Sequence, residues 1–424
     1  MADMPADAAT GLSAARPALI RAMNERSLLE RIRFSGPCSR AELARLSGLS
    51  KPTVSLALAN LERAGLVRLA GQRTGMPGRS ALLYEVRPEA GFVLALDIGM
   101  RFLRGAVADL AGVVRARGAR AVTAISASAA PAAGNGAAGP RERVAELVRL
   151  ADDLCGQAGI ARSGVTQTVV GSPGVHDRER GVIALTGELP RWGQPEALAE
   201  LRSAFGPVLT VENDVDAAAL AERAQGHGRD VDDFAFVHVG TGIGMGLVIG
   251  GQLHRGRHGA AGEIAFLPFG ADTEADLDAG PDADPDADPA EERRRGSLET
   301  AAAGAGVVRA ARRAGMLDAV SAQEVFAAGE EGDARAQAVI AAEARLVANA
   351  ICCVITVVDP ALVVLGGGIG QAPGLVESIT AELAKIAPVM PDVRVSALGT
   401  DAVVDGCLAE GTSLAWDDLV AALP

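Results

Sequence analysis

Short apolar runs that end at once in glycine-rich or acidic turns recur from residue 91 onward in this 424-residue chain. Phe92–Ile98 is followed by Gly99, and Phe234–Val239 is followed by Gly240-Thr-Gly-Ile-Gly-Met-Gly246. Such runs are typical of strands buried on both faces, as in an α/β sheet. Ligands bind to these sheets at the carboxyl ends of the strands, where the turns lie. Two sheets that face each other along such edges predict a binding cleft.

The composition excludes several classes of protein. Apolar residues make up 49% of the chain, which is enough for a sizeable core, and the length suggests two or three domains. We find no run near the roughly 20 apolar residues that a membrane span requires, and no signal-like N-terminus. Five cysteines are scattered without a CxxC pair. We therefore expect a soluble cytoplasmic protein.

The charge is unevenly distributed. Residues 1–90 contain 13 Lys and Arg against 8 Asp and Glu, a net of +5, whereas the remaining residues carry a net of −18. A small basic segment ahead of a large acidic one favours nucleic-acid binding by the basic segment.

Residues 17–90 follow the pattern of a winged helix-turn-helix domain, after an expected flexible N-terminus at 1–16. Ser39 and Glu42 form a capping box at the start of one helix, which ends near Gly48. A second helix starts at Ser50-Lys51-Pro52, with Ser50 as its cap. Two strand-like runs, Leu66–Leu69 and Ala81–Val86, then enclose a glycine-rich hairpin tip, which completes a wing.

This domain is expected to bind double-stranded DNA. The start of the second helix presents short polar side chains and a lysine for the major groove, and the wing carries arginines for phosphates. The alternative is a helical bundle whose hairpin mediates only protein contacts. The candidate DNA-binding residues are Ser50, Lys51, Pro52, Thr53, Ser55, Leu56, Arg68, Arg73 and Arg79.

Six motifs of the remaining chain, in this order, resemble the ROK family of repressors, open reading frames and sugar kinases. They are Asp97-x-Gly99, Gly171-Ser-Pro-Gly174, Glu212-Asn213-Asp214, Gly240-Thr-Gly-x-Gly-x-Gly246, Gly259-x-x-Gly262-Glu263-Ile264 and Leu365-Gly-Gly-Gly368. The resemblance implies an α/β fold, with an actin-like (ribonuclease H-like) sugar-binding body of two lobes over residues 91–424. An acidic insert at about 271–295 is expected to be disordered.

The resemblance also implies a sugar site. Asn213, Asp214, Glu263 and Glu299 match residues that bind sugar hydroxyls in the family, and carboxylates are strong hydroxyl acceptors. We add the loop Gly171, Ser172, Pro173 and Gly174 to the sugar-binding candidates. For Asn213-Asp214 the alternative is a helix N-cap without ligand contact.

Two departures from the family pattern argue against cofactors. The first phosphate loop of the kinases resembles Asp-x-Gly-Gly-Thr, but Met100 and Arg101 stand at its last two positions, which disfavours productive ATP binding. The family zinc site uses one His and three Cys, but Phe266 and Ser297 stand at two of these positions and no Cys lies between 156 and 351. We therefore expect neither zinc nor another metal, and no catalytic residues.

The leading hypothesis is a transcriptional regulator of the N-acetylglucosamine- or xylose-responsive repressor type. It would bind an operator as a homodimer or higher homo-oligomer, because one recognition helix reads too few base pairs. A sugar or sugar phosphate would be its effector, and a membrane would have no part. The alternatives are an ATP-dependent sugar kinase with an appended DNA-binding domain, and a DNA-binding scaffold whose sugar pocket has lost its ligand.

Overall fold

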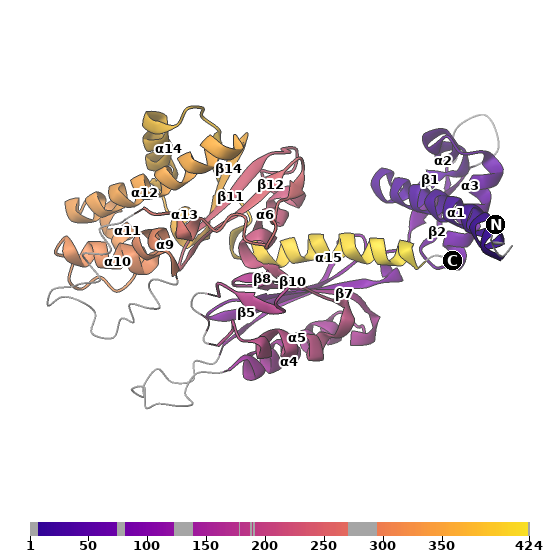
Figure 1. Cartoon of the computed structure of the whole chain (residues 1–424), viewed down its shortest axis with the longest axis horizontal. Helices are drawn as coiled ribbons and strands as arrows, with labels where there is room; N and C mark the ends of the chain where they lie inside the picture. Colours follow the sequence, from indigo (N-terminus) through magenta and orange to yellow (C-terminus); the bar gives the residue numbers. More distant parts are fainter. Residues whose placement is uncertain are drawn as a thin grey trace, which may run out of the picture.

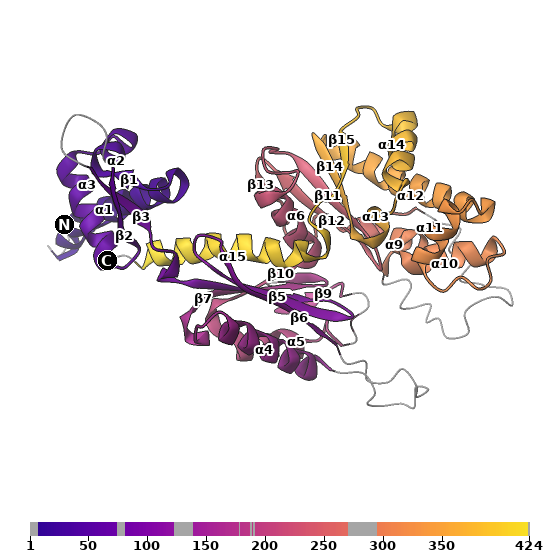
Figure 2. The same cartoon turned by 180° about the vertical axis from the view of Figure 1, so that it is seen from behind.

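The computed structural model describes residues 7–73, 81–122, 139–177, 179–186, 189, 191–269 and 295–422, with side chains from residue 19 onward. It divides into a head and two lobes, with the head at one end of the long axis (Figure 1). The head and the N-terminal lobe are joined by the last helix of the chain, which spans both (Figure 2).

The head is a winged helix. Its three helices pack around buried leucines, and its three-stranded sheet has the order β1-β3-β2. The first wing strand, β2, runs from Val67 to Arg73 and ends four residues farther than the sequence indicated, because a bulge between Leu69 and Gly71 keeps it paired with β3. The elements are α1 (Asp7–Ser35), β1 (Cys38–Ser39), α2 (Arg40–Ser47), α3 (Lys51–Arg63), β2 (Val67–Arg73) and β3 (Ala81–Val86). Helix α1 thus begins within the segment expected to be flexible.

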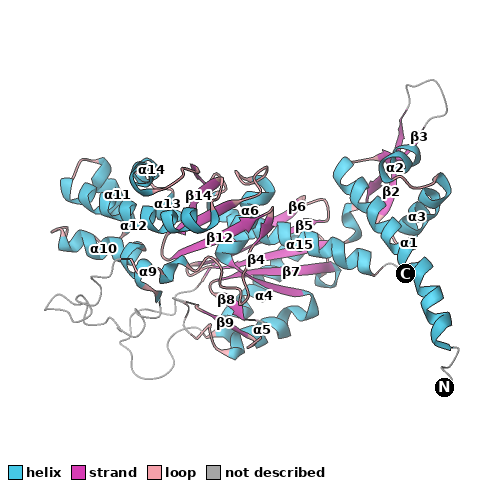
Figure 3. Ribbon diagram, turned by 45° about the horizontal axis from the view of Figure 1, so that its top comes forward, coloured by secondary structure: helices cyan, strands magenta, loops and turns pink. Residues whose placement is uncertain are grey.

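The N-terminal lobe contains a five-stranded mixed sheet with the order β10-β7-β4-β5-β6. Helices α4 and α5 cover one face of this sheet and the last helix, α15, covers the other (Figure 3). The elements are η1 (Pro88–Ala90), β4 (Phe92–Ile98), β5 (Phe102–Asp109), β6 (Val114–Ala121), α4 (Pro140–Gln157), η2 (Arg162–Gly164), β7 (Val165–Ser172), β8 (Val175–Asp177), β9 (Val182–Ala184), α5 (Pro195–Phe205), η3 (Gly206–Val208), β10 (Leu209–Asn213), η5 (Gly399–Asp401) and α15 (Ala402–Ala421).

The C-terminal lobe contains a second five-stranded sheet with the order β13-β12-β11-β14-β15. Strand β12 begins at Ile243 rather than at Leu247, so the glycine run is itself a strand. A Cβ at Gly246 would lie 2.6 Å from the Ala219 side chain, so glycine lets α6 approach the sheet closely. The elements are α6 (Asp214–Gln225), β11 (Phe234–Val239), β12 (Ile243–Ile249), β13 (Gln252–Leu253), η4 (Ile264–Phe266), α9 (Ser297–Ala302), α10 (Gly304–Arg313), α11 (Ala322–Glu330), α12 (Ala334–Val358), β14 (Leu362–Gly366), α13 (Gly367–Gly370), α14 (Leu375–Ile386) and β15 (Asp392–Val395).

Helix α12 is long and apolar enough to cross a membrane by length and composition, contrary to the expectation that no run approaches that limit. Half of its most apolar 18-residue window is buried inside the protein. Its buried residues, among them Val347 and Ile351, belong to the main apolar cluster of the C-terminal lobe. The apolarity of α12 therefore reflects its place in a lobe core.

The cores of the head and the N-terminal lobe are continuous. One apolar cluster contains Leu28 and Ile32 of α1, Trp416 of α15 and Val93 of β4. The Trp416 indole donates a hydrogen bond of 3.0 Å to the carbonyl of Leu110. Helix α15 therefore joins the head to the N-terminal lobe through buried apolar contacts.

Candidate functional site

Helix α3 has the geometry predicted for a recognition helix. The Ser50 hydroxyl caps it by accepting from the Thr53 N–H at 3.3 Å, and Pro52 lies in the first turn. Lys51, Pro52 and Leu56 are exposed, and Leu56 retains 58% of its accessible surface. Thr53 and Ser55 are half-buried, while the opposite face packs into the head core. The predicted cap at Ser50 is confirmed, and Lys51 is exposed at the start of the helix as the sequence indicated.

The predicted wing arginines have different surroundings. Arg73 pairs with Glu42 of α2, whose pKa is held at about 2, first by hydrogen bonds from Ser39 and then by Arg73. Arg68 donates to Glu85 at 2.7 Å and to Glu89 at 3.1 Å. Arg79 lies outside the described residues.

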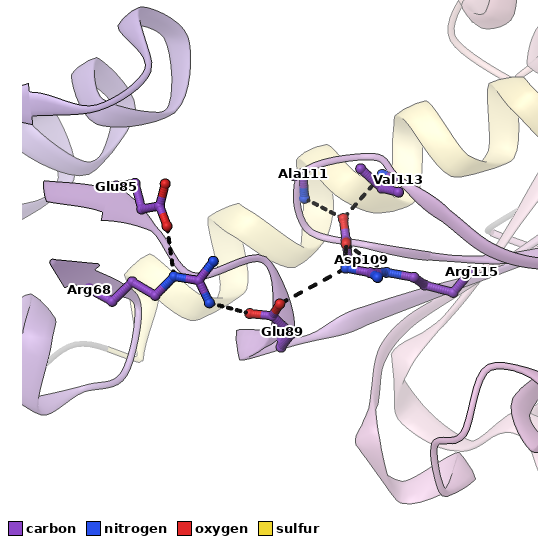
Figure 4. Close-up of polar contacts among 7 residues, drawn as sticks. All are labelled: Arg68, Glu85, Glu89, Asp109, Ala111, Val113 and Arg115. Atoms are coloured by element: carbon purple, nitrogen blue, oxygen red, sulfur yellow. Dashed lines mark hydrogen bonds and ion pairs between the residues drawn. The ribbon is translucent and has the colours of Figure 1, made fainter. Parts of the chain in front are cut away.

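The Arg68 guanidinium points to the junction between the head and the N-terminal lobe, while 47% of its side chain stays exposed (Figure 4). Glu89 also lies 3.9 Å from Arg115, which donates to Asp109 at 2.9 Å. Asp109 is fully buried and also accepts from the N–H groups of Ala111 and Val113. Arg68 is thus part of an ionic chain that connects the wing to the lobe, and its contact with DNA stays a prediction.

Acidic side chains from both lobes come together where the two sheets face each other. Asp97 ends β4, Asp214 begins α6, Glu263 precedes η4 and Glu299 lies on α9. Electrostatic interactions connect Asp214 with Asp97 and with Glu263, and Glu263 with Glu299. We call these four residues together with His238 the interlobe site. The predicted sugar ligands Asp214, Glu263 and Glu299 therefore lie near one another, and Asp97 lies beside Asp214.

Asn213 serves as the cap that was the alternative reading for this residue. Its Oδ1 accepts from the N–H groups of Val215 at 2.9 Å and Asp216 at 3.0 Å, and its Nδ2 donates to the carbonyl of Gly174 at 3.2 Å. An amide nitrogen carries two N–H donors, so the bond to the Gly174 carbonyl leaves one donor for a ligand.

The loop from Gly171 to Gly174 is held by protein contacts. Ser172 is fully buried, and its hydroxyl accepts from the Trp192 indole at 2.8 Å and donates to the Pro173 carbonyl. A Cβ at Gly171 would lie 2.4 Å from the Val403 side chain. Gly174 has a φ of +92°. The expectation that Ser172 contacts sugar is wrong for its side chain, and Gly171 and Gly174 have packing reasons of their own.

The protonation of the interlobe site is shifted toward neutrality. Burial, with a contribution from Asp214, raises the pKa of Asp97 to about 7 although Arg104 opposes the shift. Burial and the neighbouring Asp214 and Glu299 raise the pKa of Glu263 to about 7. Burial, reinforced by the neighbouring carboxylates, therefore raises the pKa values of two hydrogen-bonding groups to near physiological pH.

Sequence reasoning missed His238. It lies on β11, and a Cβ at Gly240 would approach its Nε2 to 2.8 Å. Burial lowers the pKa of His238 and raises that of Asp214, while each group opposes the shift of the other. The available signal was a lone histidine inside an otherwise apolar strand, two residues before the glycine turn.

The residues at the family's cofactor positions do not fit these groups. Phe266 has no donor atom for zinc, and Ser297 supplies a hydroxyl in place of a thiolate at the start of α9. Within the part of the chain that the structure describes, no three His, Cys, Asp or Glu side chains form a metal site. Met100 and Arg101 form the tight β4–β5 turn, where the Gly99 N–H donates to the Phe102 carbonyl at 3.1 Å. Much of the acidic insert, residues 270–294, lies outside the described residues.

Comparisons with known proteins follow the division into head and lobes. The model of the ROK family matches residues 93–409, and the model of the MarR family matches residues 23–80. Because the first match covers most of the chain, this protein belongs to the ROK family.

Individual relatives include both regulators and enzymes. The chain is 24% identical over 248 residues to the xylose repressor of Bacillus subtilis (strain 168), covering 58% of this chain and 61% of that protein. It is 33% identical over 242 residues to the bifunctional enzyme NanE/NanK of Brucella suis biovar 1, and the match covers 54% of this chain and 42% of that enzyme. The chain thus spans about 60% of the curated repressor that it matches.

The fold of the whole chain is shared with a solved regulator. This neighbour is the crystal structure of a ROK family transcriptional regulator, a homologue of the E. coli MLC protein. The match covers 95% of this chain and 98% of the regulator's chain, with a TM-score of 0.71 and 24% identity. The predicted fold class, a winged helix followed by an actin-like two-lobe body, is therefore confirmed.

Proposed function

We propose that this protein is a sugar-responsive transcriptional repressor that controls genes of carbohydrate uptake or metabolism. The observation that carries the proposal is the joining of a winged helix to a ROK body through the shared apolar core of α1, α15 and β4. An enzyme has no need for a DNA-binding domain packed into its core. A regulator needs this arrangement, because the effector domain must act on the DNA-binding domain.

The DNA contacts are assigned to Ser50, Lys51, Pro52, Thr53, Ser55 and Leu56 on α3, and to Arg73 and Arg79 of the wing. Exposed ion pairs contribute only about 0–1 kcal/mol, so phosphate can replace Glu42 as the partner of Arg73. The repressor acts in the cytoplasm as a homodimer or higher homo-oligomer on a palindromic operator, since paired half-sites supply the specificity.

The effector is assigned to the interlobe site. Asp214, Glu263 and Glu299 accept hydroxyl hydrogen bonds, and Asn213 and the backbone of Gly171–Gly174 border the same region. D-xylose is the first candidate, because a relative is named a xylose repressor. Several clustered carboxylates disfavour a sugar phosphate through charge repulsion.

We assign no catalytic residue and no metal or nucleotide cofactor. The kinase alternative has one specific argument in its favour, the 33% identity to a protein named NanE/NanK. The exposed side chains of Met100 and Arg101 in the β4–β5 turn argue against it, because they crowd the approach of phosphates. A coupled ATPase assay with D-xylose, D-glucose and N-acetyl-D-glucosamine decides: turnover that Asp214→Asn abolishes would establish the kinase.

The repressor proposal is tested with the full-length protein. A duplex is selected from a random pool, and its dissociation constant is measured with and without each of the three sugars. Lys51 and Lys385 are the only lysines of the chain, and Lys385 lies on α14 of the C-terminal lobe. We expect Lys51→Ala to weaken binding about tenfold and Lys385→Ala to leave it unchanged. A wild-type protein without preference for any duplex would refute the proposal.

A further inference from the structure

Helix α15 contacts the head, the N-terminal lobe and the helix that begins the C-terminal lobe. Near its start, Asp401 accepts from Arg117 of β6 at 2.9 Å. Near its end, Asp417 accepts from Arg26 of α1 at 3.0 Å, and the Arg33 guanidinium lies 5.8 Å from the ring centre of Trp416. The helix thus connects the sugar-binding body to the DNA-binding head (Figure 1).

Helices α6 and α15 are packed backbone to backbone. A Cβ at Gly406 of α15 would lie 1.7 Å from the carbonyl oxygen of Ala217 on α6. Helix α6 begins with Asp214 of the interlobe site and is capped by Asn213. Because the interior of a protein is close-packed, a shift of α6 is transmitted to α15.

Arg255 links the C-terminal lobe to this pair of helices. It follows β13, and its guanidinium donates to Glu212 through Nε at 3.0 Å and to Glu410 of α15 through Nη2 at 2.9 Å. Glu212 directly precedes Asn213, and its side chain is 7% exposed. The carbonyl of Arg255 accepts from the N–H of Ala261 at 3.1 Å, two residues before Glu263. The side chain of Arg255 therefore connects the Glu212–Asp214 segment to α15, and its backbone carbonyl connects it to the segment that carries Glu263.

We propose that the Arg255–Glu410 contact is a latch that transmits occupancy of the interlobe site to the DNA-binding head through α15. The inference rests on the proposed function of the protein as a sugar-responsive repressor. A sugar bound between Asp214 and Glu263 pulls the segment after β13 against α6, and Arg255 carries this displacement to Glu410. The sugar can change the DNA affinity by no more than the ratio of its own affinities for the two lobe arrangements.

The test uses Glu410→Gln in the full-length protein, with the duplex selected by the wild type. The sugar probe is whichever of D-xylose, D-glucose and N-acetyl-D-glucosamine gives the largest thermal shift with the wild type. The matched control is Glu382→Gln, because Glu382 also forms an ion pair, with Lys385 at 2.8 Å, and has a similar side-chain exposure of 24% against 18%. Sugar affinity and duplex affinity are measured separately for each protein.

In the wild type we expect the sugar to change the duplex dissociation constant by about 5- to 150-fold, the usual range of allosteric coupling. In Glu410→Gln the ratio of the duplex dissociation constants with and without sugar falls at least fivefold. The dissociation constant for the sugar itself stays within twofold of the wild-type value. Glu382→Gln responds like the wild type. Arg255→Lys, which keeps the charge but loses the fork geometry, gives the same loss and replaces Glu410→Gln if that variant fails to fold.

Two results would overturn the latch. The first is a Glu410→Gln protein whose sugar response equals that of the wild type. The second is a Glu410→Gln protein that no longer binds the sugar, since Glu410 would then support the site rather than transmit its occupancy. A wild type that binds no duplex selectively, or does not respond to any of the sugars, refutes the repressor proposal and the latch with it.

Discussion

Replacing Asp216 by asparagine is expected to stabilise the protein, and increasingly so as the pH rises. Asp216 is 3% exposed on α6, and its Oδ1 has no hydrogen-bond partner. Burial, followed by repulsion from Glu212, raises its pKa to about 8, although Arg255 opposes the shift. An ordinary aspartate titrates at about 3.9, so the folded protein holds this proton far more tightly than the unfolded chain.

The sign follows from this difference. When folding raises the pKa of a carboxyl, the group does not affect the free energy of unfolding at a pH below its unfolded-state pKa. As the pH rises from that value toward the folded-state pKa, the free energy of unfolding decreases. For Asp216 this window runs from pH 4 to about pH 8. Each pKa unit corresponds to about 1.4 kcal/mol, so the wild type loses roughly 3–5 kcal/mol by pH 7. Asparagine has nearly the same shape and does not ionise, so the variant avoids this loss.

Guanidinium unfolding of the full-length protein at pH 5, 6, 7 and 8 measures the effect. We expect the stability advantage of Asp216→Asn to grow by roughly 1 kcal/mol per pH unit. Asp392→Asn, at an exposed side chain of β15, is the control and should change stability by less than about 1 kcal/mol. An advantage that does not vary with pH, or a destabilised variant at pH 8, would refute the reasoning.

Three further predictions concern the head, its junction with the body and the effector site. Lys51→Ala should reduce the slope of log affinity against log salt by about 1, as measured by fluorescence anisotropy, because one phosphate contact is lost. Trp416→Ala should destabilise the protein by about 3–5 kcal/mol in chemical unfolding, since the ring is 4% exposed and fills the core shared by α1 and α15. Sugar affinity, measured by calorimetry, should rise about tenfold from pH 6 to pH 8, because Glu263, with a pKa of about 7, accepts hydroxyl hydrogen bonds best when ionised.

The sequence carried the local signals of the fold well. Capping residues and glycine turns act within a few residues, so Ser39 with Glu42, and Ser50, were predicted as caps and are observed as caps. The boundaries that failed depend on distant contacts. The extent of β12 is set by the packing of α6 against Gly244 and Gly246, which no local pattern reveals.

The residues of the candidate site could be predicted where they belong to motifs of the family, and the other residues of the site could not. Asp214, Glu263 and Glu299 come from three separate segments, and only the resemblance to a known family placed them together. His238 and Arg255 lie outside the sugar motifs, and their importance appears only when β11 and the segment after β13 are seen beside α6. Ser172 was misassigned because a loop motif does not reveal whether its hydroxyl faces a ligand or, as here, a buried tryptophan.

The position of the Arg68 side chain also depends on distant contacts, and it bears on how the head is held. The side chain of a basic residue on a wing strand can point toward DNA or toward the N-terminal lobe, and the sequence does not show which. In the structure Glu85 and Glu89 hold Arg68 on the side of the N-terminal lobe, and Glu89 lies near Arg115 of that lobe. Each of these pairs is partly exposed and contributes little to stability alone. Together with the Trp416 contact they attach the head to the N-terminal lobe at two separate points, so their role is to orient the head relative to the lobe.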